Sequence, residues 1–347
     1  MARYLVDSLT DSRARLNTEK FGHLTDAICP TKKYLAATAV DQITVSPDCI
    51  FAMASGGVFK TESKVLTTAD LDTGSSFSFG KDHYVYICDP GDGMSDEVYK
   101  ISLNATYPAG YTATTSRKIG GFHYGKIRTS ETISAVTEGI VPNSVWTILW
   151  RPQSDPEGMV YIGGGTWADI YLASIGSDGL LHSVYNAAPA TGTEGLNWYS
   201  FQHLFRKSGK RMGSYSDWIK CSEGSPEGLD GSNDQAWSAT TNGGRHNTGL
   251  IAKATSLVGC RDCVGNVWEW VTDLCLDPKA ATWGWQSDNS GVGFGDMYLP
   301  SATALHALIC GGGWNDGVRD GSRAVNADNS PWYVGTYVGS RGFSDSL

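Results

Sequence analysis

The brevity of the apolar runs restricts the fold most, because glycine, serine or aspartate ends each run within a few residues. From Thr44 the chain repeats this pattern in the runs ITVS, CIFAMA, GVFKT and HYVYICD. Runs of this length and composition, bounded by turn residues, predict short strands. The chain has 42 glycines among 347 residues, which fits many turns and leaves little room for long helices. We therefore expect a β-rich α+β fold.

Composition and charge narrow the classes of protein to consider. With 41% hydrophobic and 18% charged residues, the chain is expected to be globular. Its formal net charge of -9 argues against a nucleic-acid partner, because nucleic-acid binding relies on clustered lysine and arginine. No apolar run approaches the roughly 20 residues that span a bilayer, and residues 1–15 lack the apolar segment of a secretory signal. We expect no membrane insertion, and synthesis in a cytoplasm.

Three regions of different composition predict the domain order. Residues 1–42 are polar with irregularly spaced apolar residues, which suits an attachment or oligomerisation segment. The short runs that follow predict a small β-sandwich over 43–135. A polar, proline-containing stretch over 129–144 suits a connection between domains. The second domain then extends over 136–347.

The second domain shows two helix patterns and one long loop. Trp198, Phe201 and Phe205 form an apolar stripe at helical spacing, with Gly209 as the expected stop. Ser214 followed three residues later by Asp217 predicts a capping box and a second, short helix. The stretch 222–262 is rich in glycine, serine, asparagine and aspartate and is expected to be largely loop. The run GNVWEWV after it predicts a strand with its tryptophans in the core.

The cysteines admit three interpretations. Two of them form a CxxC motif, Cys260 and Cys263, but no second CxxC or histidine pair completes a zinc set at a familiar spacing. Reduced thiols packed as small hydrophobic groups are the favoured interpretation, with a zinc site and a disulfide formed after release from the cell as alternatives. The eight cysteines are Cys29, Cys49, Cys88, Cys221, Cys260, Cys263, Cys275 and Cys310.

Other patterns that could carry chemistry are weak. The stretch EGLDGSNDQ could hold calcium through Asp230, Asn233 and Asp234, but a turn rich in Asx residues is the favoured interpretation. The seven histidines are dispersed without an HxxxH or HExxH pair, and no nucleophile motif is present. We therefore predict neither an enzyme nor a bound cofactor or metal.

Five motifs occur in a specific order, namely GKRM, SDW, GNVWEW, GGGW and the pair GSRA and GSRGF. This order resembles the C-type lectin-like fold of formylglycine-generating enzymes and of the variable proteins of diversity-generating retroelements. The stretches YVYICD, PAGYTATTSRKIGGFHYG and DPEGMVYIGGGTWADIYLAS are also similar to the phage major tropism determinants. The resemblance covers about 45–347. It implies a C-terminal C-type lectin-like domain preceded by the β-sandwich and the N-terminal segment.

The two branches of this resemblance make different demands on the residues. Resemblance to formylglycine-generating enzymes would imply cysteines in the C-terminal segment after the GG(S/G)W strand, because a thiolate does the chemistry of those enzymes. In this chain no cysteine follows Cys310, which lies in the apolar run ALIC and is predicted to be core. We therefore favour the binding branch over a formylglycine-generating-type oxidase.

The last segment has the composition of a recognition surface. In WYVGTYV, Tyr333, Gly335 and Tyr337 alternate with the residues between them, which predicts two sets on opposite faces of an extended chain. Tyrosine and tryptophan supply contact area at low rotamer cost, and asparagine, serine and glycine adapt their hydrogen bonds. Composition alone leaves open that these residues are simply the closing strands of the fold.

The resemblance implies a variable binding region at about 311–343 that is diversified at adenine-containing codons within a constant frame. The displayed, ligand-binding residues would then be Gly313, Asn315, Asp316, Gly317, Arg319, Asn326, Asp328, Asn329, Tyr333, Gly335, Tyr337 and Val338. The frame would be Trp314, Gly321, Ser322, Arg323, Gly339, Arg341 and Gly342.

The function that this resemblance implies is receptor binding at the tip of a phage tail fibre. The partners would be a host cell-surface receptor, expected to be a protein, and a tail-fibre protein. Three chains would form a homotrimer in the virion after synthesis in the host cytoplasm, and several copies would amplify a weak contact. A variable ligand-binding protein displayed on a cell surface is the alternative within the same family.

Overall fold

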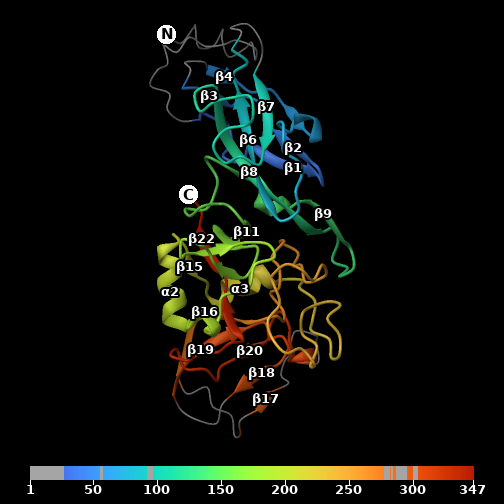
Figure 1. Cartoon of the computed structure of the whole chain (residues 1–347), viewed down its shortest axis with the longest axis vertical. Coiled ribbons are helices and arrows are strands. Elements are labelled where there is room, and N and C mark those ends of the chain that lie inside the picture. The colour runs from blue at the N-terminus through green and yellow to red at the C-terminus, as the bar shows by residue number, and fades with distance from the viewer. Residues whose placement is uncertain are drawn as a thin grey trace. The chain divides into compact units, whose positions relative to one another are not determined.

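The computed structural model describes residues 27–54, 58–91, 97–276, 282, 284–286, 295–299 and 304–347 (Figure 1). Most of the predicted attachment segment, 1–42, therefore lies outside the described residues. The described chain separates into two compact units. The first contains the residues up to 125 together with 138–151, and the second contains 126–137 and 152–346.

The first unit is built from short antiparallel strands. One sheet has the order β1-β2-β5, a second has the order β10-β8-β6-β7 with β9 on β8, and β3 and β4 form a hairpin. The strands are β1 (Leu35–Ala39), β2 (Gln42–Val45), β3 (Ile50–Ala52), β4 (Val58–Lys60), β5 (Lys64–Leu66), β6 (Lys81–Cys88), β7 (Val98–Ser102), β8 (Ser116–Arg128), β9 (Val136–Ile140) and β10 (Trp146–Thr147). In β6 every residue from His83 to Cys88 is buried, so this strand lies inside the unit. Its apolar side chains pack with Ile101, Ile119 and Phe122.

Among its described residues, the second unit contains two larger sheets and two α-helices. The larger sheet has the order β17-β18-β20-β19-β16-β21, the other has the order β11-β12-β22-β15, and β13 pairs with β14. Its strands are β11 (Met159–Gly163), β12 (Thr166–Asp169), β13 (Ala173–Ile175), β14 (Leu181–Ser183), β15 (Arg211–Met212), β16 (Trp268–Leu276), β17 (Gly284–Gln286), β18 (Met297–Leu299), β19 (Leu305–Cys310), β20 (Val325–Asn326), β21 (Val338–Ser340) and β22 (Gly342–Asp345). The helices are α2 (Trp198–Lys207) and α3 (Tyr215–Ser222). The predicted β-rich α+β class is confirmed for the described residues.

The end of α2 and the start of α3 lie where the sequence predicts. The side chain of Asn197 accepts a hydrogen bond from the N–H of Ser200 at the start of α2, and Gly209 after its end has a φ of +71°. In α3, Ser214 and Asp217 form the predicted capping box. Helix α2 packs against β15, and α3 packs against β11, β16 and β19. The helices therefore stabilise the strands from which the C-terminal segment departs.

No helix in the described part of the chain is long and apolar enough to cross a membrane.

Candidate functional site

The C-terminal segment, coloured red in Figure 1, starts at the end of β19 and finishes in β22. Gly311 and Gly312 turn the chain out of β19 with φ values of +96° and +98°, and a Cβ at Gly312 would collide with the Asp320 carboxylate. The chain then forms a first loop (311–324), strand β20, and a second loop (327–337). Strand β21 runs parallel to β16, and β22 pairs with β12 and β15. Both sheets of the second unit therefore hold the segment.

Arg341 is the deepest anchor of this segment, with a side chain that is fully buried. Its guanidinium forms an ion pair with Glu269, with 3.0 Å between Nε and Oε2. It also donates to the carbonyl oxygens of Asp169 (2.8 Å), Ile170 (2.7 Å) and Arg261 (2.6 Å). Burial opposes the charge of Arg341, but nearby cysteines and Glu269 outweigh it and raise the pKa of Arg341. Burial raises the pKa of Glu269 to about 7, against the lowering effect of Arg341.

The neighbouring frame residues fit closely into the same region. Gly342 donates its N–H to Asp169 Oδ2 at 3.1 Å, and a Cβ at Gly339 would lie 2.9 Å from the carbonyl oxygen of Ala190. Ser322 accepts a hydrogen bond from Ser222 through its backbone carbonyl, and Arg323 pairs with Glu223 at 2.6 Å. Of the predicted frame, Gly321, Ser322, Gly339, Arg341 and Gly342 are buried, and Trp314 and Arg323 are half-buried.

The residues predicted to be displayed fall into three groups. Asn315 and Arg319 are exposed. Half-buried are Asp316, Asn326, Asp328, Tyr333 and Tyr337. Buried are Gly313, Gly317, Asn329, Gly335 and Val338. The expectation that these last five are displayed is therefore wrong for this chain.

Each of the five residues is buried by a specific contact. Val338 lies in β21 opposite Trp268 and belongs to the apolar core. Asn329 and Gly335 accept backbone hydrogen bonds from Ala307 (2.9 Å) and Gly192 (3.0 Å). The remaining two are glycines of the first loop: the N–H of Gly317 bonds to the carbonyl of Ser238, and that of Gly313 bonds to the Asp316 carboxylate, each at 3.0 Å.

The two tyrosines of the second loop interact with each other. The hydroxyl of Tyr333 donates to that of Tyr337 at 2.8 Å, and both rings pack against the apolar core. Burial raises the pKa of Tyr337, and its hydrogen bond with Tyr333 raises it further. Burial alternates from Tyr333 to Tyr337 as predicted, but the exposed face is the other one, because Val334 and Thr336 are exposed while the tyrosines are half-buried. The alternation ends at Val338, which is buried.

Two exposed groups were not predicted, Trp332 and Val318. Trp332 is 70% exposed and its ring packs at a tilt against Tyr199 of α2, with 4.4 Å between ring centroids. Val318 of the first loop is 63% exposed, next to the predicted Arg319, whose guanidinium lies 5.0 Å from the centre of the Trp285 ring. A tryptophan directly after a proline in a turn could have indicated that Trp332 is exposed. Nothing in the sequence indicated that Tyr199 lies beside it.

Hydrogen bonds with neighbouring segments hold the first loop in place. Asp316 accepts hydrogen bonds from the indole N–H of Trp268 (2.9 Å) and the N–H of Gly313. Asn242 donates to the carbonyl of Trp314 at 2.8 Å. Asp320 is fully buried and neither of its carboxylate oxygens has a hydrogen-bond partner. Burial raises the pKa of Asp320 well above its usual value, and the nearby Asp316 adds to the effect.

The calcium candidate in the long loop bonds to protein groups. Asn233 Oδ1 accepts from the N–H groups of Ser238 and Ala239, each at 3.0 Å. The hydroxyl of Thr240 donates to Asp230, and Lys253 pairs with Asp234. Asp230, Asn233 and Asp234 are therefore held by groups of the same loop.

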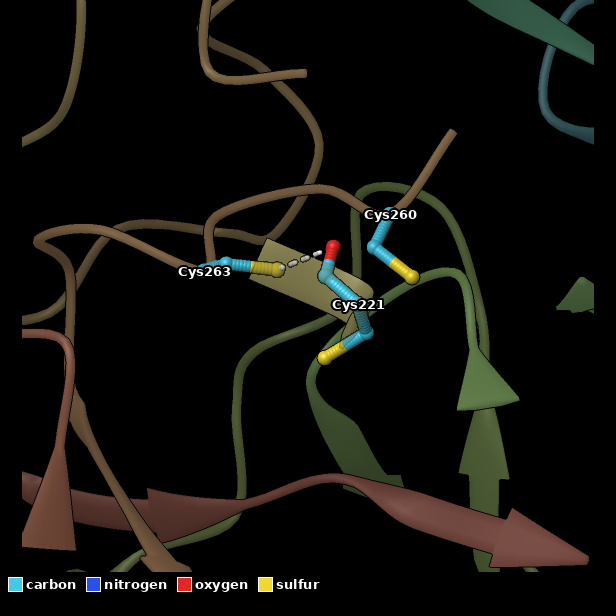
Figure 2. Close-up of side chains that lie close together, drawn as sticks. All are labelled: Cys221, Cys260 and Cys263. Carbon is cyan, nitrogen blue, oxygen red and sulfur yellow. Dashed lines mark hydrogen bonds between the residues drawn. The ribbon is translucent and has the colours of Figure 1, made fainter. Parts of the chain in front are cut away.

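Four cysteines of the second unit are buried, and Cys275 is half-buried. Figure 2 shows Cys221 beside Cys260 and Cys263, and the sequence did not reveal this neighbour because it lies far earlier in the chain. Cys310 is buried apart from them, and burial raises its pKa well above the usual value. A buried thiol of this kind is a poor nucleophile, so Cys310 does not suit an oxidase.

Comparisons with known proteins agree with this fold. Residues 33–147 match the family described as Mtd second domain. The tail fiber receptor-binding protein of Bordetella phage BPP-1 is 29% identical over 323 residues, which cover 85% of this chain and 80% of that protein. The structure of the major tropism determinant M1 variant has a TM-score of 0.73 at 24% identity and covers 93% of this chain and 86% of its own. The U1 variant has a TM-score of 0.73 at 25% identity, covering 94% and 88%. The predicted C-type lectin-like fold class is confirmed.

Proposed function

We propose that this chain, which resembles the major tropism determinants along most of its length, is a phage tail-fibre protein that binds a host receptor. One observation supports this function most strongly: a buried frame anchored by Arg341 holds two loops whose exposed side chains include Arg319 and Trp332. The relative from Bordetella phage BPP-1 is named for the same activity.

The exposed groups suit recognition of another molecule. Tryptophan and arginine are the residues that most often dominate binding energy at interfaces. The two loops also support each other, because the Trp314 ring meets the Tyr337 ring edge-on at 6.4 Å between centroids. A supported loop loses less conformational entropy when it binds. We propose that the protein acts by binding alone, without catalysis.

Retroelement diversification belongs to the same proposal. Exposed or half-buried positions such as Asn315, Arg319, Asn326 and Asp328 can change side chain with little effect on the core. The buried positions of the frame cannot change in this way, because each side chain or glycine there makes a packing or hydrogen-bonding contact. We propose that variation is concentrated at the exposed and half-buried positions, including Tyr333 and Tyr337.

We also propose the assembly that the resemblance implies. Three chains would join through the N-terminal segment and the sandwich at 43–135, attach to a tail-fibre protein, and point the domain at 136–347 toward the cell. Several modest contacts would then act together as avidity. The receptor is expected to be a protein, because a side-chain surface of this kind suits a protein epitope.

Adsorption to host cells tests the binding surface. We expect the double substitution Arg319→Ala and Trp332→Ala to weaken binding at least ~30-fold, since loss of a hot spot costs about 2 kcal/mol or more. The matched control replaces an exposed tyrosine and an exposed arginine elsewhere, Tyr107→Ala and Arg206→Ala. The measurement is competition by purified protein against phage adsorption, with circular dichroism to verify folding. A folded double variant that competes as well as the wild type would refute the proposed surface.

A further inference from the structure

Three cysteines meet in the interior of the second unit (Figure 2). Cys221 lies in the last turn of α3, and Cys260 and Cys263 lie in the turn that precedes β16. All three are buried, and their Sγ atoms lie within 4.8 Å of one another. Cys221 Sγ is 3.0 Å from the carbonyl oxygen of Trp218, and Cys263 Sγ is 3.6 Å from that of Cys221.

We propose that Cys221, Cys260 and Cys263 bind a zinc ion through three thiolates. Zinc–sulfur bonds of ~2.3 Å in a tetrahedral arrangement place sulfur atoms about 3.8 Å apart. The observed spacing reaches this value with shifts of less than about 1 Å, which rotations of the cysteine side chains can supply. Soft thiolate ligands favour zinc over the hard cations magnesium and calcium.

Zinc would offset two of the three negative charges that the thiolates carry. The Arg341 guanidinium, which also pairs with Glu269, lies beside the cluster. Arg341 is held at this place because it donates to the carbonyl oxygen of Arg261, which lies between two of the cysteines in the chain. Charged groups in a protein interior are tolerated when they are compensated in this way.

The end of α3 offers a fourth ligand. The last carbonyl groups of a helix have no partner within the helix, and together they carry the negative end of its dipole. Cys221 precedes the final residue of α3, and Figure 2 shows its carbonyl oxygen directed toward the Cys263 sulfur. This oxygen can complete a four-coordinate site without a movement of the helix.

The site would connect three separate parts of the second unit. Zinc would tie the end of α3 to the turn at 260–263, and that turn holds Arg341 of the C-terminal segment. Metal binding would therefore stabilise the scaffold beneath the two loops, since the free energy of binding adds to that of folding. The inference stands on the cysteines alone and does not depend on receptor binding.

Metal analysis of the full chain tests the site. Protein purified with a reducing agent from zinc-supplemented cells should contain about one zinc ion per chain by plasma mass spectrometry. Replacement by Co²⁺ should give the near-ultraviolet charge-transfer band of cobalt–thiolate bonds. Cys260→Ser should lose most of the bound metal and weaken that band. The matched control, Cys310→Ser, removes an equally buried thiol outside the cluster and should keep both.

Two results would overturn the site. One is wild-type protein that binds neither zinc nor Co²⁺ after reconstitution with excess metal. The other is an intact mass two hydrogens lower in protein purified without reductant, with peptide mapping that joins two of these cysteines as a disulfide. If Cys260→Ser does not fold, two measurements on the wild-type protein still test the site. A cobalt–thiolate band and a lower melting temperature after chelation support the site, and the absence of both refutes it.

Discussion

At the scale of single residues, two sets of buried ionisable groups near the loops differ in how they are compensated. Arg341 and Glu269 form an ion pair, whereas Asp320 has no hydrogen-bond partner for either oxygen. A buried polar group of this kind costs on the order of 1–3 kcal/mol. Asp320 therefore lowers the stability of the first loop.

Substitution of Asp320 predicts a specific pH dependence. Because burial raises its pKa, the folded chain binds a proton at Asp320 at pH values where the unfolded chain does not. The contribution of Asp320 to stability is then complete below the unfolded pKa of 3.8 and is lost as the pH rises through the folded pKa. Asp320→Asn should therefore stabilise the chain at neutral pH, by about 1.4 kcal/mol for each unit of pKa shift, and give no gain near pH 3.

Urea unfolding of both proteins between pH 3 and pH 8 measures this difference. Asp316→Asn is the comparison variant, because its carboxylate already accepts two hydrogen bonds and the substitution should destabilise the chain at neutral pH. A constant difference between Asp320→Asn and the wild type across this range would mean that the Asp320 carboxyl has an ordinary pKa.

At the scale of elements, local signals were predictable and tertiary ones were not. The C-terminal end of α2 follows from Gly209 and the N-terminal start of α3 from Ser214, because caps depend on residues within one turn. The exposed face of the second loop was not predictable, since the loop is held by hydrogen bonds with distant residues such as Gly192. Burial of Val338 in β21 likewise depends on its parallel partner β16, which no local pattern reveals.

The same limit applied to the candidate site. The frame was predictable because the motifs GSRA and GSRGF identify it, and the structure buries most of its residues. The contact between the exposed Trp332 and Tyr199 joins a loop to a helix that is remote in sequence, so the sequence did not indicate it. The meeting of Cys221 with the CxxC motif is also a product of the folded chain.

Substitution of Arg341 tests how strongly the stability of these elements depends on one residue. It joins the C-terminal segment to Glu269 of β16, to Asp169 of β12 and to the turn around Arg261. Arg341→Met keeps much of the side-chain volume but leaves Glu269 buried without its partner, which should cost about 3–5 kcal/mol in the free energy of unfolding. Chemical denaturation measures this loss, and Arg206→Met on the exposed face of α2 should change stability by less than about 0.5 kcal/mol. A loss below about 1 kcal/mol for Arg341→Met would show that the frame is held by packing alone.

At the scale of the whole molecule, net charge acts on adsorption before any contact forms. The formal charge of -9 and the negative surface of a bacterial cell repel each other over a distance set by the Debye length. That length falls from ~30 Å at 0.01 M salt to ~8 Å at 0.15 M. Salt therefore weakens the long-range repulsion much more than it weakens a short contact such as the one proposed between Arg319 and a receptor.

The adsorption rate constant should consequently rise several-fold between 0.01 M and 0.15 M sodium chloride, while the dissociation rate changes little, because steering acts mainly on association. Phage adsorption kinetics or surface-bound receptor extracts provide the measurement. An uncharged osmolyte at the same osmolality is the control and should leave the rate unchanged. A rate that falls with salt would contradict this account, because it would mean that a local positive surface around Arg319 outweighs the net charge during approach. In that case Arg319→Ala should abolish the salt dependence.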